Sequence, residues 1–262
     1  MKNKLHFISG LPRSGSTLLA AILKQNPRFV GGMTSPVSTL FRAIEDSTAK
    51  RVETSIFITE KQRESFLKGI FSTYYQEYVN KVIFDTSRMW CARLSILCKL
   101  FPHSKVICCA RDLSWIMDSF ERVYRRNNQK PSGIYNYDTG GTVYSRTVSI
   151  ASSNGVVGYA LDAMREALAS EYTDRILVVE YEDMCKDPKV VMGRIYDFIG
   201  EDKFEHDFDN VEYSAGEFDK QMDAIGLHDV RGSVQWKPRT TILPPDLFAR
   251  FSNDNFWREN VH

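Results

Sequence analysis

Short apolar runs alternate with amphipathic segments along most of the chain. Four runs are short and largely apolar, which is typical of strands buried on both faces: residues 5–9, 82–85, 105–110 and 176–179. The segments between them carry apolar residues at helical spacing and predict helices at residues 17–24, 35–45, 59–79, 89–100, 113–126 and 157–170. We therefore expect an α/β fold in which a parallel sheet carries helices on both faces.

The segment at residues 59–79 is the longest of the predicted helices. Thr59 is a candidate N-cap for it, because a threonine hydroxyl can accept a hydrogen bond from the first turn. Four apolar or aromatic side chains recur at every fourth position, which predicts a stripe facing the core: Phe66, Ile70, Tyr74 and Tyr78.

The helical pattern continues to residue 200 and then weakens. A proline at the first position predicts a helix at residues 188–200, which a glycine ends. Residues 201–262 are expected to form an irregular C-terminal portion with a short closing helix after Pro245. No repeat or linker divides the sequence, so we expect a single domain over residues 1–262.

Composition limits the classes of function. The 262 residues carry a formal net charge of +1, so no global field attracts nucleic acid or an anionic membrane. Five cysteines form no CxxC pair or His–Cys cluster, and we therefore expect no metal site. Neither a signal peptide nor an apolar stretch long enough to span a membrane is present, which makes the cytoplasm the expected location.

A candidate phosphate-binding loop lies between the first strand and the first helix. Residues 10–17 (GLPRSGST) follow the spacing G-x-x-x-x-G-x-T. Glycines let backbone amides turn inward, and the following helix N-terminus adds a positive dipole end. Nucleotide triphosphatases place a lysine after the second glycine, but Ser16 stands there, and the loop carries Arg13 instead. A serine-rich turn that only caps an ordinary helix is the plainer alternative.

Other polar side chains fall where ligands bind in parallel sheets. Ligands of such sheets sit beyond the carboxyl ends of the strands. Four residues are expected at those ends: Gly10, Asp85, Arg111 and Tyr181. The alternatives for Arg111 and Tyr181 are a solvated strand end and a packing residue.

Three segments together resemble the sulfotransferase family. Residues 12–19 (PRSGSTLL) look like the 5'-phosphosulfate loop of tyrosylprotein sulfotransferases and related bacterial enzymes. Arg111, followed eight residues later by Ser119, resembles the 3'-phosphate site of the family, and Tyr181 resembles a tyrosine near the bound nucleotide. The matches occur in the family's order over residues 5 to about 200.

The resemblance implies a sulfotransferase fold and a reaction. The donor would be 3'-phosphoadenylyl sulfate (PAPS), which leaves as adenosine 3',5'-bisphosphate (PAP) without a metal. Arg13 would act on the transferred group and the leaving phosphate. The implied donor-binding residues of the first loop are Pro12, Arg13, Ser14, Gly15, Ser16, Thr17 and Leu18.

The residues after position 226 resemble the family's C-terminal loop over the nucleotide. This resemblance implies donor-binding roles for Ser233 and Lys237. Trp236 is expected to pack in the core, with stacking on adenine as the alternative. The glycine-rich loop at residues 127–142 contains Tyr135 and Tyr137 and is a candidate acceptor lid, or else a plain connection.

The catalytic base departs from the family pattern. Tyrosylprotein sulfotransferases carry a glutamate about 21 residues after the loop arginine, and Thr34 stands at that position here. Asp85 is the leading candidate for the base, with a helix cap as its alternative role, and Glu45 and His228 are further candidates. The family also tends to carry a lysine in the segment at residues 84–88, where the nearest cation is Arg88.

We expect the acceptor to be a hydroxyl or amine of a small molecule of the secondary-metabolite type. A peptide tyrosine is the runner-up. An ATP-dependent kinase is the alternative from another class, because residues 82–85 resemble a Walker-B strand. A non-catalytic nucleotide-binding module is the third hypothesis. The sequence leaves the oligomeric state open.

Overall fold

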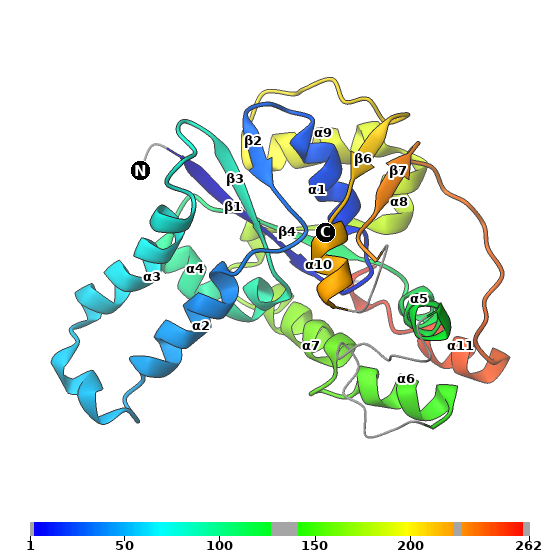
Figure 1. Ribbon diagram of the computed structural model, residues 1–262, viewed down its shortest axis with the longest axis horizontal. Helices are drawn as coiled ribbons and strands as arrows, with labels where there is room; N and C mark the ends of the chain where they lie inside the picture. Colours follow the sequence, from blue (N-terminus) through cyan, green and yellow to red (C-terminus); the bar gives the residue numbers. More distant parts are fainter. Residues whose placement is uncertain (1–2, 127–140, 223–226, 259–262) are drawn as a thin grey trace.

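A five-stranded parallel sheet forms the centre of the protein (Figure 1). The computed structural model describes residues 3–126, 141–222 and 227–258. The strands lie in the order β2–β3–β1–β4–β5 and span β1 (Lys4–Gly10), β2 (Phe29–Gly31), β3 (Val82–Thr86), β4 (Val106–Ala110) and β5 (Ile176–Glu180). This confirms the predicted parallel sheet and adds the three-residue β2, which is too short to show in the sequence pattern.

Strand register brings the polar strand ends to one edge of the sheet. β1 lies in the middle, with Ile8 opposite Thr86 of β3 and Gly10 opposite Cys109 of β4. Cys109 in turn lies opposite Val179 of β5. The carboxyl ends of β3, β1, β4 and β5 therefore follow one another along this edge, where ligands of parallel sheets bind.

Helices cover both faces of the sheet, as predicted. Successive residues of β1 face opposite ways, so that Phe7 belongs to one core cluster and Ile8 to the other. The cluster around Ile8 includes α1 (Ser16–Lys24), α8 (Tyr181–Lys186) and α9 (Pro188–Ile199). The cluster around Phe7 includes α2 (Val37–Ser47), α3 (Glu60–Tyr74), α4 (Leu94–Leu100), α5 (Leu113–Arg126), α6 (Val143–Ala151), α7 (Val156–Leu168) and α11 (Pro245–Ser252).

The helical hairpin of α2 and α3 extends from the body of the molecule (Figure 1). The 3₁₀ segment η1 (Glu53–Phe57) joins the two helices at the tip. The predicted N-cap of α3 is confirmed, since the Thr59 hydroxyl accepts from Gln62 N in a capping box. This hairpin is called the arm below.

The predicted core stripe of α3 is wrong for three of its four residues, since Ile70 packs against the core but Phe66, Tyr74 and Tyr78 are exposed. Phe66 and Tyr74 are 47% and 46% exposed, whereas Leu67 and Phe71 are 1% and 0% exposed. The helix carries two apolar stripes offset by one residue, and the hairpin buries the second one against α2 and the sheet. Spacing alone could not choose between them. The helix also ends at Tyr74 rather than at residue 79.

The C-terminal portion has more regular structure than expected. β6 (Val211–Tyr213) and β7 (Val230–Gly232) pair antiparallel, and α10 (Gly216–Gln221) lies between them in the chain. The closing helix after the two prolines is confirmed as α11. The predicted helix at residues 188–200 is confirmed as α9, with Gly200 left-handed at its end. Three short 3₁₀ segments complete the described structure: η2 (Arg88–Arg93), η3 (Thr173–Arg175) and η4 (Phe256–Arg258).

Two further expectations concern the acceptor lid and the absence of a membrane-spanning segment. Tyr135 and Tyr137 of the candidate acceptor lid lie outside the described residues. Within the described residues, none of the helices has the length and apolar character to cross a membrane.

Candidate active site

The loop between β1 and α1 requires its two glycines. Gly10 has φ 107°, and a Cβ there would lie 2.2 Å from the Cys109 carbonyl oxygen of the neighbouring strand. Gly15 has φ 89°, and its Cβ would lie 2.7 Å from a ring carbon of Tyr181. Leu11 N donates to the Cys109 carbonyl at 2.8 Å, which ties the loop to β4. α1 then begins at Ser16, so the loop has the form of a phosphate cradle at a helix N-terminus.

Arg13 connects this loop to two distant parts of the chain. Its φ of 59° is left-handed, which is uncommon for a residue with a side chain. Its Nε donates to Ser119 Oγ at 3.1 Å, and its Nη1 donates to the Leu227 carbonyl at 2.9 Å. The arginine of the loop, the serine of α5 and the C-terminal segment thus meet at one point. The Ser14 hydroxyl, in contrast, is buried and donates to the Leu11 carbonyl within the loop.

Arg111 lies behind the loop at the carboxyl end of β4. It is 8% exposed, and its Nη1 donates to the Arg13 carbonyl at 3.2 Å. The guanidinium lies over the Tyr181 ring at 4.2 Å from the centroid, and its Nε is 3.7 Å from Glu182 Oε1. Burial raises the pKa of the Glu182 carboxyl, and Arg111 acts in the opposite direction. Loop, aromatic ring and carboxylate together fix the direction of the Arg111 fork.

A cavity of about 650 Å³ opens beyond this edge of the sheet. The loop from Gly10 to Leu18 lines its floor, with the exception of the buried Ser14, and Arg111 and Tyr181 line the side toward β4 and β5. A smaller cavity of about 180 Å³ shares Arg111, Tyr181 and Gln235 with the first and is lined further by Trp115, Trp236, Lys237 and Arg239. The two cavities therefore lie next to each other on this side.

The opposite side of the large cavity is built by β3 and the start of α2. Its lining residues are Met33, Thr34, Ser35, Ser38, Thr39, Thr86, Ser87 and Arg88. We call this set the β3 wall. Thr34, where the family resemblance led us to expect a glutamate, is part of it. The phosphate loop on β1 thus separates a side with Arg111 from a side rich in hydroxyl groups.

The structure corrects the leading candidate for the base. Asp85 is 0% exposed and does not line the cavity. Its carboxylate accepts from Ser35 Oγ at 2.6 Å, Tyr75 OH at 2.7 Å and Trp90 Nε1 at 2.8 Å. Burial raises the pKa of Asp85, and the three hydrogen bonds partly oppose that rise. Asp85 joins β3 to the arm and is not placed to reach an acceptor.

Glu45 is also not placed to act as a base. Its carboxylate forms an ion pair with Arg93 Nε at 2.7 Å, and the residue does not line the cavity. The sequence could not show whether Glu45 lines the cavity, because that depends on the direction in which α2 leaves the sheet. Only the first turn of α2 lines the cavity.

His228 differs from both carboxylates because it lines the cavity. Its Nδ1 is 2.5 Å from Asp219 Oδ1, and its backbone N donates to Asp219 Oδ2 at 2.9 Å. Asp219, on α10, is 0% exposed. The bond at Nδ1 orients the imidazole and leaves Nε2 as its second nitrogen, and the backbone bond holds the residue against the same carboxylate. Asp219 was missed in the sequence because nothing in its local pattern marks it; only folding of the C-terminal portion brings it to His228.

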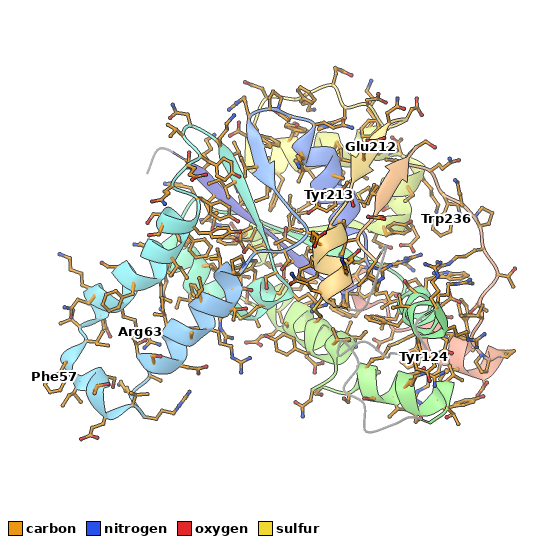
Figure 2. All side chains as sticks on the ribbon, viewed as in Figure 1. Phe57, Arg63, Tyr124, Glu212, Tyr213 and Trp236 are labelled. Carbon is orange, nitrogen blue, oxygen red and sulfur yellow. The ribbon has the colours of Figure 1, made fainter. Side chains whose placement is uncertain are left out.

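The remaining C-terminal residues fall at the two cavities. Ser233 lines the large cavity and Lys237 the small one. The expected core packing of Trp236 is wrong, because this residue is half-buried on the segment after β7, lines the small cavity and lies under Lys186 Nζ at 5.7 Å (Figure 2). Ser119, in the middle of α5, is 6% exposed, lines neither cavity and accepts a hydrogen bond from Arg13 Nε.

Comparison with known proteins assigns the class. The Sulfotransferase family profile matches residues 6–206, and the chain therefore belongs to the sulfotransferase family. It is a sulfotransferase enzyme, and the kinase and the non-catalytic module are accordingly wrong. No curated protein matches the chain in a sequence comparison.

Solved structures share the fold at low sequence identity. The sulfotransferase domain from the curacin biosynthetic pathway is 18% identical, with a TM-score of 0.52 over 78% of this chain and 75% of that one. A sulfotransferase from Alicyclobacillus acidocaldarius is 13% identical, with a TM-score of 0.50 over 99% and 92%. Mouse sulfotransferase SULT7A1, solved in complex with PAP, is 17% identical, with a TM-score of 0.50 over 78% and 61%.

Proposed function

We propose that this sulfotransferase moves the sulfuryl group of PAPS to a hydroxyl or amine of a small-molecule acceptor. The observation that carries the proposal is the meeting of Arg13, Ser119 and Arg111 at a glycine loop that lacks the triphosphatase lysine. Arginine forks and inward backbone amides bind phosphate and sulfuryl oxygens. The complex of mouse SULT7A1 with PAP supports the choice of donor.

The shape of the two cavities favours one direction for the donor. The loop amides and Arg13 would hold the 5'-phosphosulfate, and Arg111 with Ser119 would hold the 3'-phosphate. The nucleoside would then extend toward the small cavity, where Trp115, Trp236 and Lys237 provide aromatic and cationic contacts. Residues 227–230 and 232–235 line the large cavity, and we expect the C-terminal portion to close over the nucleotide, with Ser233 among its contacts.

This direction leaves the β3 wall for the acceptor. The acceptor oxygen or nitrogen would attack sulfur in line with the oxygen that links it to the 5'-phosphate. A new S–O or S–N bond forms, the old S–O bond breaks, and PAP leaves with the electron pair. Arg13 and the loop amides stabilise the charge that develops on the leaving phosphate.

His228 is the base that we propose for this step. Its Nε2 would take the proton that the acceptor loses, and Asp219 would stabilise the resulting imidazolium. The imidazole lines the cavity, whereas the carboxylates of Asp85 and Glu45 do not. Thr34 offers no base at the position of the family glutamate, which favours a small molecule over a peptide tyrosine.

Ligand-induced stabilisation tests the donor assignment. PAP at 100 times its Kd should stabilise the native state by about 2.7 kcal/mol, whereas ATP with Mg²⁺ should give no comparable shift. Transfer of ³⁵S from PAPS to a panel of phenols, alcohols and amines tests the reaction. Stabilisation by ATP with Mg²⁺ but not by PAP would contradict the proposal. Transfer only to peptide tyrosine would overturn the acceptor assignment and leave the donor assignment standing.

A further inference from the structure

The β3 wall presents hydroxyl groups to the large cavity. Six of its eight residues are serine or threonine, and they come from the turn before α2, the first turn of α2 and the end of β3. Two of the hydroxyls have structural roles, since Ser35 Oγ donates to Asp85 and Ser87 Oγ accepts from Met89 N. A wall of this kind suits a polar ligand and gives little apolar contact to a lipid-like one.

Thr86 provides a separate indication of a ligand. It is 6% exposed, lines the cavity, and its Oγ1 has no hydrogen-bond partner among the described residues. A buried hydroxyl without a partner is unfavourable, so a native structure normally supplies one. The strand register fixes the position of Thr86, because this residue pairs with Ile8, which lies two residues before Gly10 of the phosphate loop. A ligand group beside the loop would satisfy this hydroxyl.

Arg88 adds a positive charge to the same wall. It lies two residues after Thr86, and its backbone is held against the end of β1 because Ser9 Oγ donates to the Arg88 carbonyl at 3.2 Å. Its side chain is exposed to the cavity and forms no hydrogen bond or ion pair with any described residue. Other arginines of the site are engaged: Arg13 with Ser119 and Leu227, and Arg111 with Tyr181 and Glu182.

No carboxylate of the described residues lines the β3 wall. The aspartate that lines the cavity, Asp229, belongs to the segment before β7 and accepts from Ser214 Oγ at 2.9 Å. Arg88 is thus the one charged residue among the eight of the β3 wall, while the loop is expected to bind the donor anion separately. An arginine held in a concave, polar site recognises planar anions through paired N–H donors.

We propose that the acceptor carries a carboxylate, which Arg88 binds, and that Thr86 donates a hydrogen bond to the same acceptor. This proposal rests on the proposed function and names the acceptor class for that reaction. The carboxylate anchors the molecule on the β3 wall, and the hydroxyl or amine that receives the sulfuryl group points toward the loop. Donor binding does not depend on Arg88.

Matched acceptor pairs test this assignment. Each pair consists of a carboxylate and its primary amide on the same scaffold, such as 4-hydroxyphenylacetate and its amide, glucuronate and glucuronamide, and serine and serinamide. Transfer of ³⁵S from PAPS should show kcat/KM about 10- to 100-fold higher for the preferred carboxylate than for its amide, the range of a charge-assisted hydrogen bond. Preference for the amides, or transfer to neither member of any pair, overturns the proposal.

Variants separate the acceptor role from the donor role. Arg88→Met should abolish the preference for the carboxylate and leave PAP stabilisation unchanged, and Arg88→Lys should restore part of the preference. Thr86→Val should lower kcat/KM for the same acceptor. The control is Arg63→Met, because Arg63 lies on the arm away from the cavity (Figure 2). A preference that survives Arg88→Met, or a loss of PAP binding in that variant, refutes the role of Arg88. Failure of the proposed function itself would appear as absent PAP stabilisation in the unmodified protein.

Discussion

The pairing of Asp219 with His228 gives the sharpest test of the reaction. Asp219→Asn keeps the size of the side chain but removes its charge. Asparagine has one oxygen and one NH₂ group, so it can accept only one of the two hydrogen bonds that His228 now donates at 2.5 and 2.9 Å. The imidazole then loses its fixed direction, its favoured tautomer and the counter-charge for its protonated form.

The expected loss of kcat follows from what a positioned general base contributes to the rate. General base catalysis supplies about 10²- to 10⁴-fold. His228→Gln should lower kcat by about that factor, and Asp219→Asn by about 10² because the imidazole remains present. KM for PAPS should stay unchanged in both, because neither change touches Arg13 or Arg111. The double variant should be no slower than His228→Gln alone, since the two residues act as one unit.

Steady-state kinetics on purified variants provide the measurement, with Tm as the control for folding. Asp219 is buried, so its substitution lowers stability, and kcat must be compared at a temperature where all variants are folded. A merely structural role would lower Tm and leave kcat of the folded fraction intact. Near-wild-type kcat in Asp219→Asn, or additive losses in the double variant, would refute the assignment of this pair.

Three further predictions concern other parts of the molecule. Arg111→Ala should raise KM for PAPS at least tenfold with an unchanged fold, because a charge-assisted bond to the 3'-phosphate is lost; unchanged donor affinity in titration would rule out that role. Gly10→Ala should abolish PAP binding and lower Tm, because its Cβ would meet the Cys109 carbonyl at 2.2 Å, and wild-type Tm would contradict this. Burial lowers the pKa of His6 from 6.5 to about 4, so the folded state disfavours protonation of this imidazole. The free energy of unfolding is therefore at its full value above pH 6.5 and should fall by about 3 kcal/mol as the pH drops toward 4. Denaturant titrations of the wild type and His6→Gln should show a shallower acid loss in the variant, and equal slopes would argue against His6 as the source.

The sheet and its loop could be predicted because local chemistry determines them. The four longer strands are apolar runs, and the glycines at 10 and 15 occupy positions where a side chain would collide with the neighbouring strand or with Tyr181. The order of strands and loops then places Arg111 at the edge that binds ligands. These features depend on periodicity and backbone geometry, which a single sequence reveals.

The base and the acceptor wall could not be predicted in the same way. Asp85 stands at a strand end, as expected, yet the arm folds over it, and its carboxylate accepts three hydrogen bonds from Ser35, Tyr75 and Trp90. Asp219 and His228 come together only after α10 and β7 have formed. The choice between Phe66 and Leu67 as the buried stripe depends on the neighbour of α3, which lies elsewhere in the chain.

The buried carboxylate of Asp85 has a consequence for how such an enzyme can change. The floor of the cavity is anchored in the central strands, whereas part of its β3 wall belongs to an arm that Ser35 and Tyr75 attach to this one carboxylate. The residues of the β3 wall can therefore change without a change in the residues of the cavity floor. An arm from another protein should be accepted where it offers a serine and a tyrosine that can make the same two hydrogen bonds to Asp85. These two hydrogen bonds, rather than the length of the helices, decide which arms can be exchanged.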